Sequence, residues 1–245
     1  MNIKPKSSKA ARLACGLALA CSLSAGTAEA APLTWNAATD FSMSQAGGAW
    51  SYGTTGTSLD GAFNPFTQAT SIAGYDYWSG ASYAQIGKAG PSGFASGTVS
   101  VPARSLNVSP GSSGEYAVLR FTAQSAGAYS INAAIWGDDF AGPTTTDVHV
   151  RSNGSDLFAG DVNSYGQANG LGWSGPIELA TGQTIDFVIG YGANKTYNYD
   201  NTGLDVTVSK LEANVPEPGT LAGISLGFGM LAASRRRLRR QSAKP

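Results

Sequence analysis

Asp138 and Asp139 form the most concentrated acidic group in the chain, and Asp147 follows nearby. The pair comes just after an alternating apolar run that ends at Trp136, so we expect it in a loop at a strand end. Oxygen ligands on loops are what calcium prefers, and a calcium ion held by these three aspartates is one prediction. The sequence has no spaced D-x-D-x-D-G loop, and the alternative is that they are solvated turn carboxylates.

Other signals for catalysis are weak. Paired carboxylates can hydrolyse glycosidic bonds, but only at a separation that a sequence does not reveal. His149, the single histidine, alternates with Val148 and Val150, so we expect it on the opposite face of its strand from both valines. Residues 223–227 fit G-x-S-x-G, but they lie in an apolar segment without a histidine base. We predict a non-catalytic protein and keep a glycan-active enzyme as the alternative.

Aromatic side chains gather in polar, glycine-rich segments. An aromatic face gives a sugar ring apolar contacts, while neighbouring Asn and Asp side chains bind its hydroxyls. Filling of the core is the alternative for any single ring. The candidate glycan-contacting residues are Tyr75, Tyr77, Trp78, Trp173, Tyr197 and Tyr199.

The scaffold for these residues is predicted to be all-β. The chain has 32 glycines in 245 residues, roughly twice the average share of ~7%, which favours many short strands and turns. Apolar residues alternate over most of 116–122, 128–136 and 146–151, as in half-buried strands. Further strands are expected at 98–101, 156–159, 176–179, 184–189 and 204–211. Together they predict an antiparallel β-sandwich, to which residues 31–105 add strands and long loops.

Charge and cysteine content exclude several classes of function. From Asp40 to Glu212 there are six basic and fourteen acidic residues, a formal charge of −8. An acidic domain without a basic stripe argues against nucleic acid as a partner. The only cysteines, Cys15 and Cys21, precede a predicted cleavage site after Ala30. The mature chain is therefore expected to have no disulfide, thiolate metal site or cysteine nucleophile.

Residues 1–30 have the pattern of a secretory signal peptide. Four basic residues precede an apolar stretch at 13–23, and Ala28-Glu29-Ala30 forms an A-x-A cleavage site. We therefore predict recognition by the Sec export machinery and cleavage by signal peptidase after Ala30.

The C-terminus has the pattern of a membrane anchor. An apolar segment, predicted as a helix over about 219–234, is shorter than the ~17–25 residues of a comfortable span, and a buried helix is the alternative. A cluster of basic residues follows, and positive charge stays on the cytoplasmic side, so the preceding domain lies outside. The cluster consists of Arg235, Arg236, Arg237, Arg239 and Arg240.

Between domain and anchor stands Pro216-Glu217-Pro218, and residues 214–240 as a whole resemble the PEP-CTERM sorting signal of exported bacterial proteins. The resemblance implies processing by an exosortase, a membrane peptidase of Gram-negative bacteria that make exopolysaccharide. The three residues are then recognition residues. Two prolines keep the segment extended and open to a peptidase.

Residues 31–213 also resemble a recurrent ectodomain of such proteins, through 40–42, 50–53, 115–122, 127–129 and 146–150. This resemblance implies a jelly-roll-like sandwich akin to carbohydrate-binding modules and transfers no catalytic residue. We predict an exported surface or matrix protein, anchored by its C-terminal helix until it is processed and associated with exopolysaccharide. A glycan-active enzyme and a purely structural or adhesive envelope protein are the alternatives.

Overall fold

The computed structural model describes residues 33–142 and 144–212, which form two antiparallel sheets. Sheet A runs in the order β14 (Leu171–Leu179), β11 (Gly127–Gly137), β16 (Thr202–Lys210), β9 (Leu106–Ser109), β6 (Gln85–Ala89), β5 (Tyr75–Ser79) and β4 (Gln68–Ile72), and β1 (Thr34–Asn36) also pairs with β16. Sheet B runs β13 (Ser155–Val162), β12 (Thr146–Ser152), β15 (Thr184–Ile189), β10 (Ala117–Thr122), β2 (Trp50–Thr54) and β3 (Asn64–Pro65).

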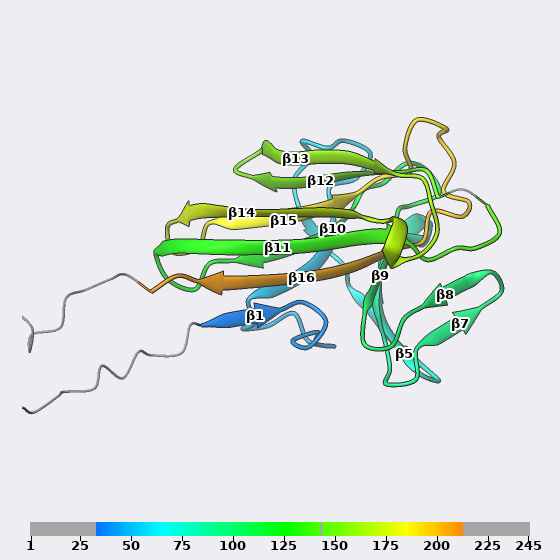
Figure 1. Cartoon of the computed structure of the whole chain (residues 1–245), viewed down its shortest axis with the longest axis horizontal. Coiled ribbons are helices and arrows are strands. Elements are labelled where there is room, and N and C mark those ends of the chain that lie inside the picture. The colour runs from blue at the N-terminus through cyan, green and yellow to red at the C-terminus, as the bar shows by residue number, and fades with distance from the viewer. Residues whose placement is uncertain (1–32, 143, 213–245) are drawn as a thin grey trace, which may run out of the picture. The chain divides into compact units, whose positions relative to one another are not determined.

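Three small elements complete the described fold. Strands β7 (Phe94–Ser96) and β8 (Val99–Val101) form a separate hairpin. Two short 3-10 helices, η1 (Ala81–Tyr83) and η2 (Gln167–Asn169), lie in connections between strands. Figure 1 shows the hairpin and β5 at one end of the long strands β11 and β16.

The last eight strands have jelly-roll order. Along the chain, β9, β11, β14 and β16 join sheet A, whereas β10, β12, β13 and β15 join sheet B. The resulting sheets, β9-β16-β11-β14 and β10-β15-β12-β13, are the two four-stranded halves of a double-sheet jelly roll. The predicted all-β antiparallel sandwich is therefore confirmed. The earlier strands extend both sheets, with β6, β5 and β4 beyond β9 and with β2 and β3 beyond β10.

The core lies between the two sheets and is rich in aromatic rings. Phe121 of β10 meets Trp35 at 5.4 Å, Trp50 at 5.2 Å and Tyr129 at 5.9 Å between ring centroids, all edge to face or tilted steeply. Such ring pairs add about 0.5–1.5 kcal/mol beyond the burial of their apolar area. Alternation selects the inward side chains, because every second residue of a strand faces the same side.

Several strands begin and end close to their predicted bounds. β15 covers the predicted 184–189, and β10, β11 and β12 match their alternating runs within one or two residues. β14 is longer than predicted, since it starts at Leu171. Its first half holds Gly172 and Gly175, which hide the strand pattern, and as an outer strand of sheet A it tolerates Pro176.

Both predicted targeting segments lie outside the described residues. They are the signal peptide at 1–30 and the sorting segment at 214–240 with its anchor helix and arginine cluster. Within 33–142 and 144–212, none of the helices has the length and apolar character needed to cross a membrane.

Four connections meet at one end of the sandwich, on the right in Figure 1. The backbone N–H of Ser112 donates to the carbonyl of Ser82 at 2.6 Å, which ties the β9–β10 connection to η1. The Thr144 hydroxyl donates to the carbonyl of Tyr199 at 3.2 Å, which ties the β11–β12 connection to the β15–β16 connection. Residues far apart in the sequence are thereby fixed around one opening.

Candidate functional site

A cleft of about 530 Å³ opens between these connections, and we call it the tyrosine cleft. Its size lies within the range of small-ligand sites. η1, the start of β6 and the end of β9 supply one part of its lining, and the β15–β16 connection supplies another. The lining residues are Tyr83, Gln85, Ser109, Asp139, Tyr197, Asn198, Tyr199 and Asn201.

Three tyrosines in the cleft are exposed. The exposed fraction is 73% for Tyr83, 38% for Tyr197 and 45% for Tyr199. The rings of Tyr83 and Tyr197 are parallel within 3°, with centroids 6.1 Å apart. Tyr83 and Tyr199 also have φ values of 66° and 68°, a left-handed conformation that costs a non-glycine residue about 1–3 kcal/mol. Both rings are exposed in spite of that cost, which makes these two tyrosines candidate binding residues.

Backbone hydrogen bonds, ring packing and the buried side chain of Asp200 fix the β15–β16 connection. The N–H of Asp200 donates to the carbonyl of Tyr197 at 3.2 Å. The ring of Tyr199 packs on Gly142, where an added Cβ would lie 2.6 Å from its Cδ2 atom. Asp200 itself is buried, and its Oδ1 accepts from the backbone N–H and hydroxyl of Thr145 at 2.8 and 3.0 Å. Burial raises the pKa of Asp200 to about 6.

The polar groups of the cleft are largely free to bind a ligand. Ser109 donates to Oδ1 of Asn201 at 2.8 Å, and Nε2 of Gln85 donates to Ser109 at 3.5 Å. The described part of the chain offers no partner to Oε1 of Gln85, Nδ2 of Asn201, the side-chain amide of Asn198 or the three tyrosine hydroxyls. Uncharged donors and acceptors beside aromatic faces suit a ligand with many hydroxyl groups.

Asp139 is the carboxylate of the cleft, and its neighbour Asp138 is buried beside it. Asp139 accepts from the Thr98 hydroxyl at 3.1 Å and from the N–H of Ala141 at 3.0 Å. Asp138 accepts from Nε1 of Trp136 at 2.7 Å and from Nδ2 of Asn107 at 2.9 Å. Burial raises the pKa of Asp138 to about 7, although these two hydrogen bonds act in the opposite direction.

The structure does not bring Asp138, Asp139 and Asp147 together as calcium ligands. Each already binds protein donors, and Asp147 accepts from the N–H of Gly192 at 2.8 Å. Across the described ranges there is no group of three or more His, Cys, Asp or Glu side chains that could hold a metal ion. The calcium prediction therefore has no support from this geometry.

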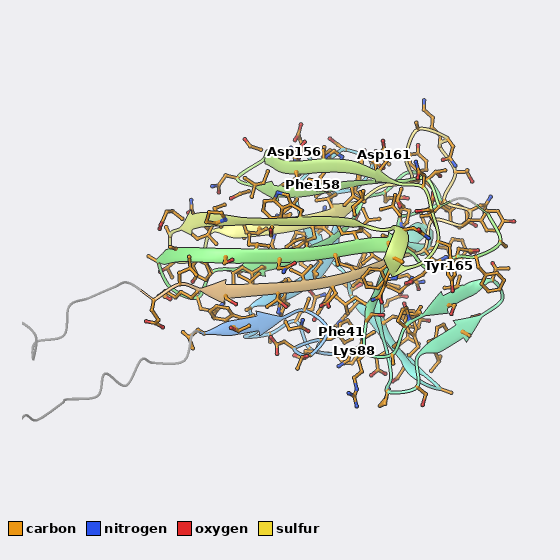
Figure 2. All side chains as sticks on the ribbon, in the orientation of Figure 1. Phe41, Lys88, Asp156, Phe158, Asp161 and Tyr165 are labelled. Atoms are coloured by element: carbon orange, nitrogen blue, oxygen red, sulfur yellow. The ribbon has the colours of Figure 1, made fainter. Side chains whose placement is uncertain are left out.

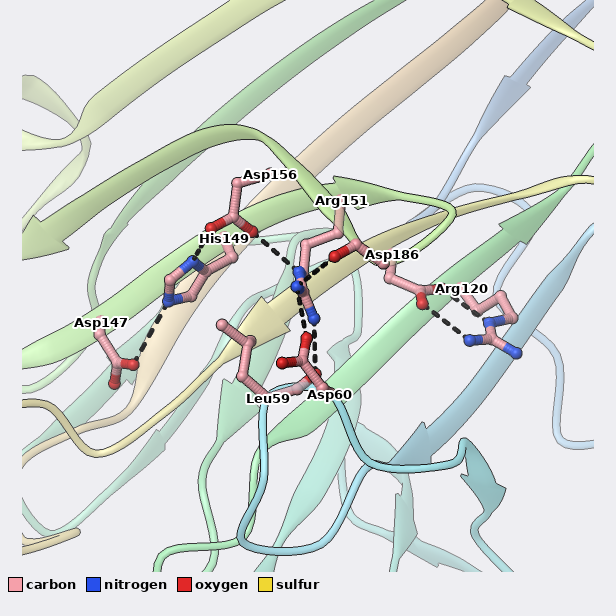
Figure 3. Close-up of polar contacts among 9 residues, drawn as sticks. Leu59, Asp60, Arg120, Asp147, His149, Arg151, Asp156 and Asp186 are labelled. Atoms are coloured by element: carbon pink, nitrogen blue, oxygen red, sulfur yellow. Dashed lines mark hydrogen bonds and ion pairs between the residues drawn. The ribbon is translucent and has the colours of Figure 1, made fainter.

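His149 lies on the outer face of sheet B, opposite the buried Val148 and Val150, as its alternation predicts. Figure 3 shows it between Asp147, with Nε2–Oδ2 3.5 Å, and Asp156, with Nδ1–Oδ2 3.2 Å. Its pKa is raised, first by the hydrogen bond to Asp147 and also by the charge of Asp156, against a lowering by burial.

Arg151 extends this network. It donates to Asp156 at 2.8 Å, to Asp60 at 2.7 Å and to the carbonyl of Leu59 at 2.6 Å (Figure 3). The arginine thus holds the 59–60 loop against sheet B. With their donors and acceptors bound to one another, these residues indicate a structural network.

The six predicted sugar-contacting aromatics separate into three groups. Tyr197 and Tyr199 line the tyrosine cleft. Tyr75 and Tyr77 line an adjoining cavity. Trp78 is 7% exposed and donates to the carbonyl of Ser42 at 2.8 Å, whereas Trp173 packs against the core edge and Phe158. Figure 2 shows Phe158 along β13, remote from the connections around Tyr165.

No sequence pattern indicates Gln85, Ser109 and Asn201 as site residues, and Tyr83 is not among the six predicted sugar-contacting aromatics. Polar residues at strand ends carry no distinctive pattern. The one usable signal for Tyr83 is its position in the same glycine-rich segment as Tyr75 and Tyr77.

The comparison with protein families concerns the C-terminus. The PEP-CTERM protein-sorting motif matches residues 214–240. This chain carries a PEP-CTERM sorting signal. The predicted resemblance is confirmed for this segment, and the motif marks an exported protein that an exosortase sorts through its C-terminal region.

Solved structures are similar to the chain only in part. A structure described as "CBM4 structure and function" has a TM-score of 0.29 and 16% identity, covering 46% of this chain and 75% of its own. A family 35 carbohydrate binding module from Clostridium thermocellum has a TM-score of 0.28 and 13% identity, over 40% and 71%. Rabbit GITRL has 0.26 and 18%, over 39% and 71%. Similarities this low do not identify a ligand. No curated protein matches the chain.

Proposed function

We propose that this PEP-CTERM protein binds a neutral extracellular polysaccharide through the tyrosine cleft and does not cleave it. One observation carries the proposal: the exposed rings of Tyr83 and Tyr199 stand in left-handed backbone conformations beside polar groups that have no partner in the described part of the chain. Rings of this kind stack on the apolar face of a sugar, and the free amides and hydroxyls bind its hydroxyl groups. Exopolysaccharide from the producing cells is the expected ligand.

Binding is tested by affinity electrophoresis of the full chain, in detergent, through gels that contain exopolysaccharide from the producing cells. Tyr197→Ala and Tyr83→Ala are expected to weaken retardation at least about tenfold, since each removes one face of the stacked pair. Tyr165→Ala is the matched control, because Tyr165 is 43% exposed and does not line the cleft. Unretarded wild-type protein, or equal losses in all three variants, contradicts the proposal.

Absence of turnover is tested in the same preparations. Two carboxyl groups are needed for the usual glycosidase mechanisms, and Asp139 is the carboxylate among the residues that line the cleft. We expect no release of reducing ends from the polysaccharide. Release that disappears in Asp138→Asn or Asp139→Asn would favour the glycan-active enzyme, and neither binding nor release would favour the structural or adhesive protein.

The targeting steps complete the proposal. Export through the Sec machinery, cleavage after Ala30 by signal peptidase, retention by the 219–234 helix and its arginine cluster, and exosortase cleavage near Pro216-Glu217-Pro218 follow in that order. Mass spectrometry of protein from medium and from membranes tests them together. A released form that begins at Ala31 and ends near Pro216 is expected. A membrane form that keeps Arg235 to Arg240, with no released form, contradicts exosortase processing.

A further inference from the structure

A second cavity adjoins the tyrosine cleft. It has a volume of about 300 Å³, and we call it the hairpin cavity because Phe94, Ser96 and Val99 of the β7–β8 hairpin line it. Gln85 and Asn201 line both spaces, so the two meet at these side chains. Each of the two is as large as a small-ligand site by itself.

Sheet A supplies the other wall of the hairpin cavity with aromatic rings. Tyr75 and Tyr77 of β5 stack with centroids 5.6 Å apart, and Tyr75 also stacks on Phe94 of the hairpin at 4.5 Å. Gly87 on the neighbouring strand β6 makes room for this arrangement, because an added Cβ there would lie 2.7 Å from Cβ of Tyr77. The aromatic character of the tyrosine cleft therefore continues into the second cavity.

The segment that contributes Asp139 to the tyrosine cleft also holds the hairpin in place. The N–H of Ser100 donates to the carbonyl of Asp138 at 2.8 Å, and the N–H of Phe140 donates to the carbonyl of Thr98 at 3.1 Å. The Thr98 hydroxyl donates to the side chain of Asp139 at 3.1 Å. One segment thus fixes a residue of the cleft and the wall of the hairpin cavity, and we call the two adjoining spaces together the groove.

Exposed residues line both parts of this groove. Tyr83 is 73% exposed in the tyrosine cleft, and Ile72 is 48% exposed in the hairpin cavity. Solvent therefore reaches side chains in each part, and a polymer bound across both can extend beyond them.

We infer that the groove binds an internal stretch of a linear polysaccharide, with consecutive sugar residues in the tyrosine cleft and the hairpin cavity. This inference rests on the proposed function and adds the ligand class: a chain recognised along its length, with Gln85 and Asn201 at the junction. Affinity then rises with chain length until both spaces are filled, and it does not depend on a free reducing end.

The test uses calorimetry of the full chain in detergent with size-fractionated oligosaccharides from partial acid hydrolysis of the exopolysaccharide, their reducing ends converted to alditols with borohydride. Ser96→Trp fills the hairpin cavity from an exposed position. Ala95→Trp is the matched control, because the adjacent residue of a strand faces the opposite side and Ala95 is also exposed. Thermal unfolding of both variants establishes that they remain folded.

We expect wild-type affinity to rise about tenfold or more from the shortest binding fraction to the plateau. Ser96→Trp is expected to lose the rise with chain length but to keep the affinity for the shortest fraction. Ala95→Trp is expected to keep the rise and the affinity for the shortest fraction. Tyr197→Ala is expected to lose the rise and the affinity for the shortest fraction. Binding that is independent of length, or unchanged in Ser96→Trp, overturns the internal-stretch inference and leaves the proposed function standing. Absence of binding by any fraction and by the intact polymer overturns both.

Discussion

Raising the pH from 5 to 8 should destabilise the domain through Asp138. Burial raises the pKa of this carboxyl from 3.8 to about 7 in the folded protein. Between those two values the folded state holds a proton that the unfolded state has lost. Stability therefore falls as the pH rises, by about 1.4 kcal/mol per pH unit for one group, and it levels off above the folded pKa. Over the whole window the loss amounts to about 4 kcal/mol, of which roughly 2–3 kcal/mol falls between pH 5 and 8.

Asp138→Asn separates this contribution from those of other titrating groups. The amide cannot accept from both the Trp136 indole and the Asn107 amide, so the variant should be about 1–3 kcal/mol less stable than wild type at pH 5. The variant should not show the decline in stability that ionisation of Asp138 causes between pH 5 and 8. Urea unfolding at pH 5, 6, 7 and 8, followed by tryptophan fluorescence, gives the difference between wild type and variant at each pH. We expect this difference to shrink by roughly 2–3 kcal/mol from pH 5 to 8.

Trp136→Phe tests the hydrogen bond that lowers the pKa of Asp138 against the effect of burial. The variant removes the indole donor, whose hydrogen bond lowers the pKa of Asp138, so that pKa should rise further and the decline should continue above pH 7. A constant difference between wild type and Asp138→Asn, within about 0.5 kcal/mol over the whole range, would refute the reasoning. It would mean that the two hydrogen bonds keep the carboxylate ionised despite its burial.

Three further predictions concern the scaffold. The raised pKa of His149 means that its contribution to stability is complete below its unfolded pKa of 6.5 and is lost as the pH rises through the folded value; His149→Gln should abolish that loss in urea unfolding. Gly203→Ala should cost about 1–3 kcal/mol, because the new methyl group meets an indole ring, whereas Gly172→Ala, which has open space, should be close to neutral in the same assay. Arg120→Met should cost about 1–2 kcal/mol, since it breaks the two-pronged pair with Asp186 at 2.6 and 2.7 Å, and added salt should reduce the difference in thermal unfolding.

Local pattern accounts for the strands and for the face on which side chains lie. The alternation around His149 places it on the outer face of β12, and the run at 184–189 gives β15 its bounds. Such predictions succeed because a side chain's direction in a strand depends on its immediate neighbours. The alternation of His149 with two valines is enough to assign the face of each side chain, without knowledge of the neighbouring strands.

The tyrosine cleft depends instead on strand order. Gln85 belongs to β6 and Asn201 precedes β16, and they line one space because β9 lies between these two strands in sheet A. Periodicity contains no information about that order. Asp138 illustrates the same limit: a loop carboxylate in sequence, it is buried because Asn107 of β9 and the β7–β8 hairpin meet it.

β16 runs from the tyrosine cleft to the place where it pairs with β1. At one end of this strand Asn201 lines the cleft, and at the other Ser209 pairs with Thr34, so the first and last described strands meet there. Nine residues at about 3.3 Å each place the two ends roughly 30 Å apart. The residues that line the cleft come from strand ends and connections at one end of the sandwich, and all of them precede Glu212 in the chain. Loss of the C-terminal segment should therefore alter the protein's location and not its affinity for a glycan.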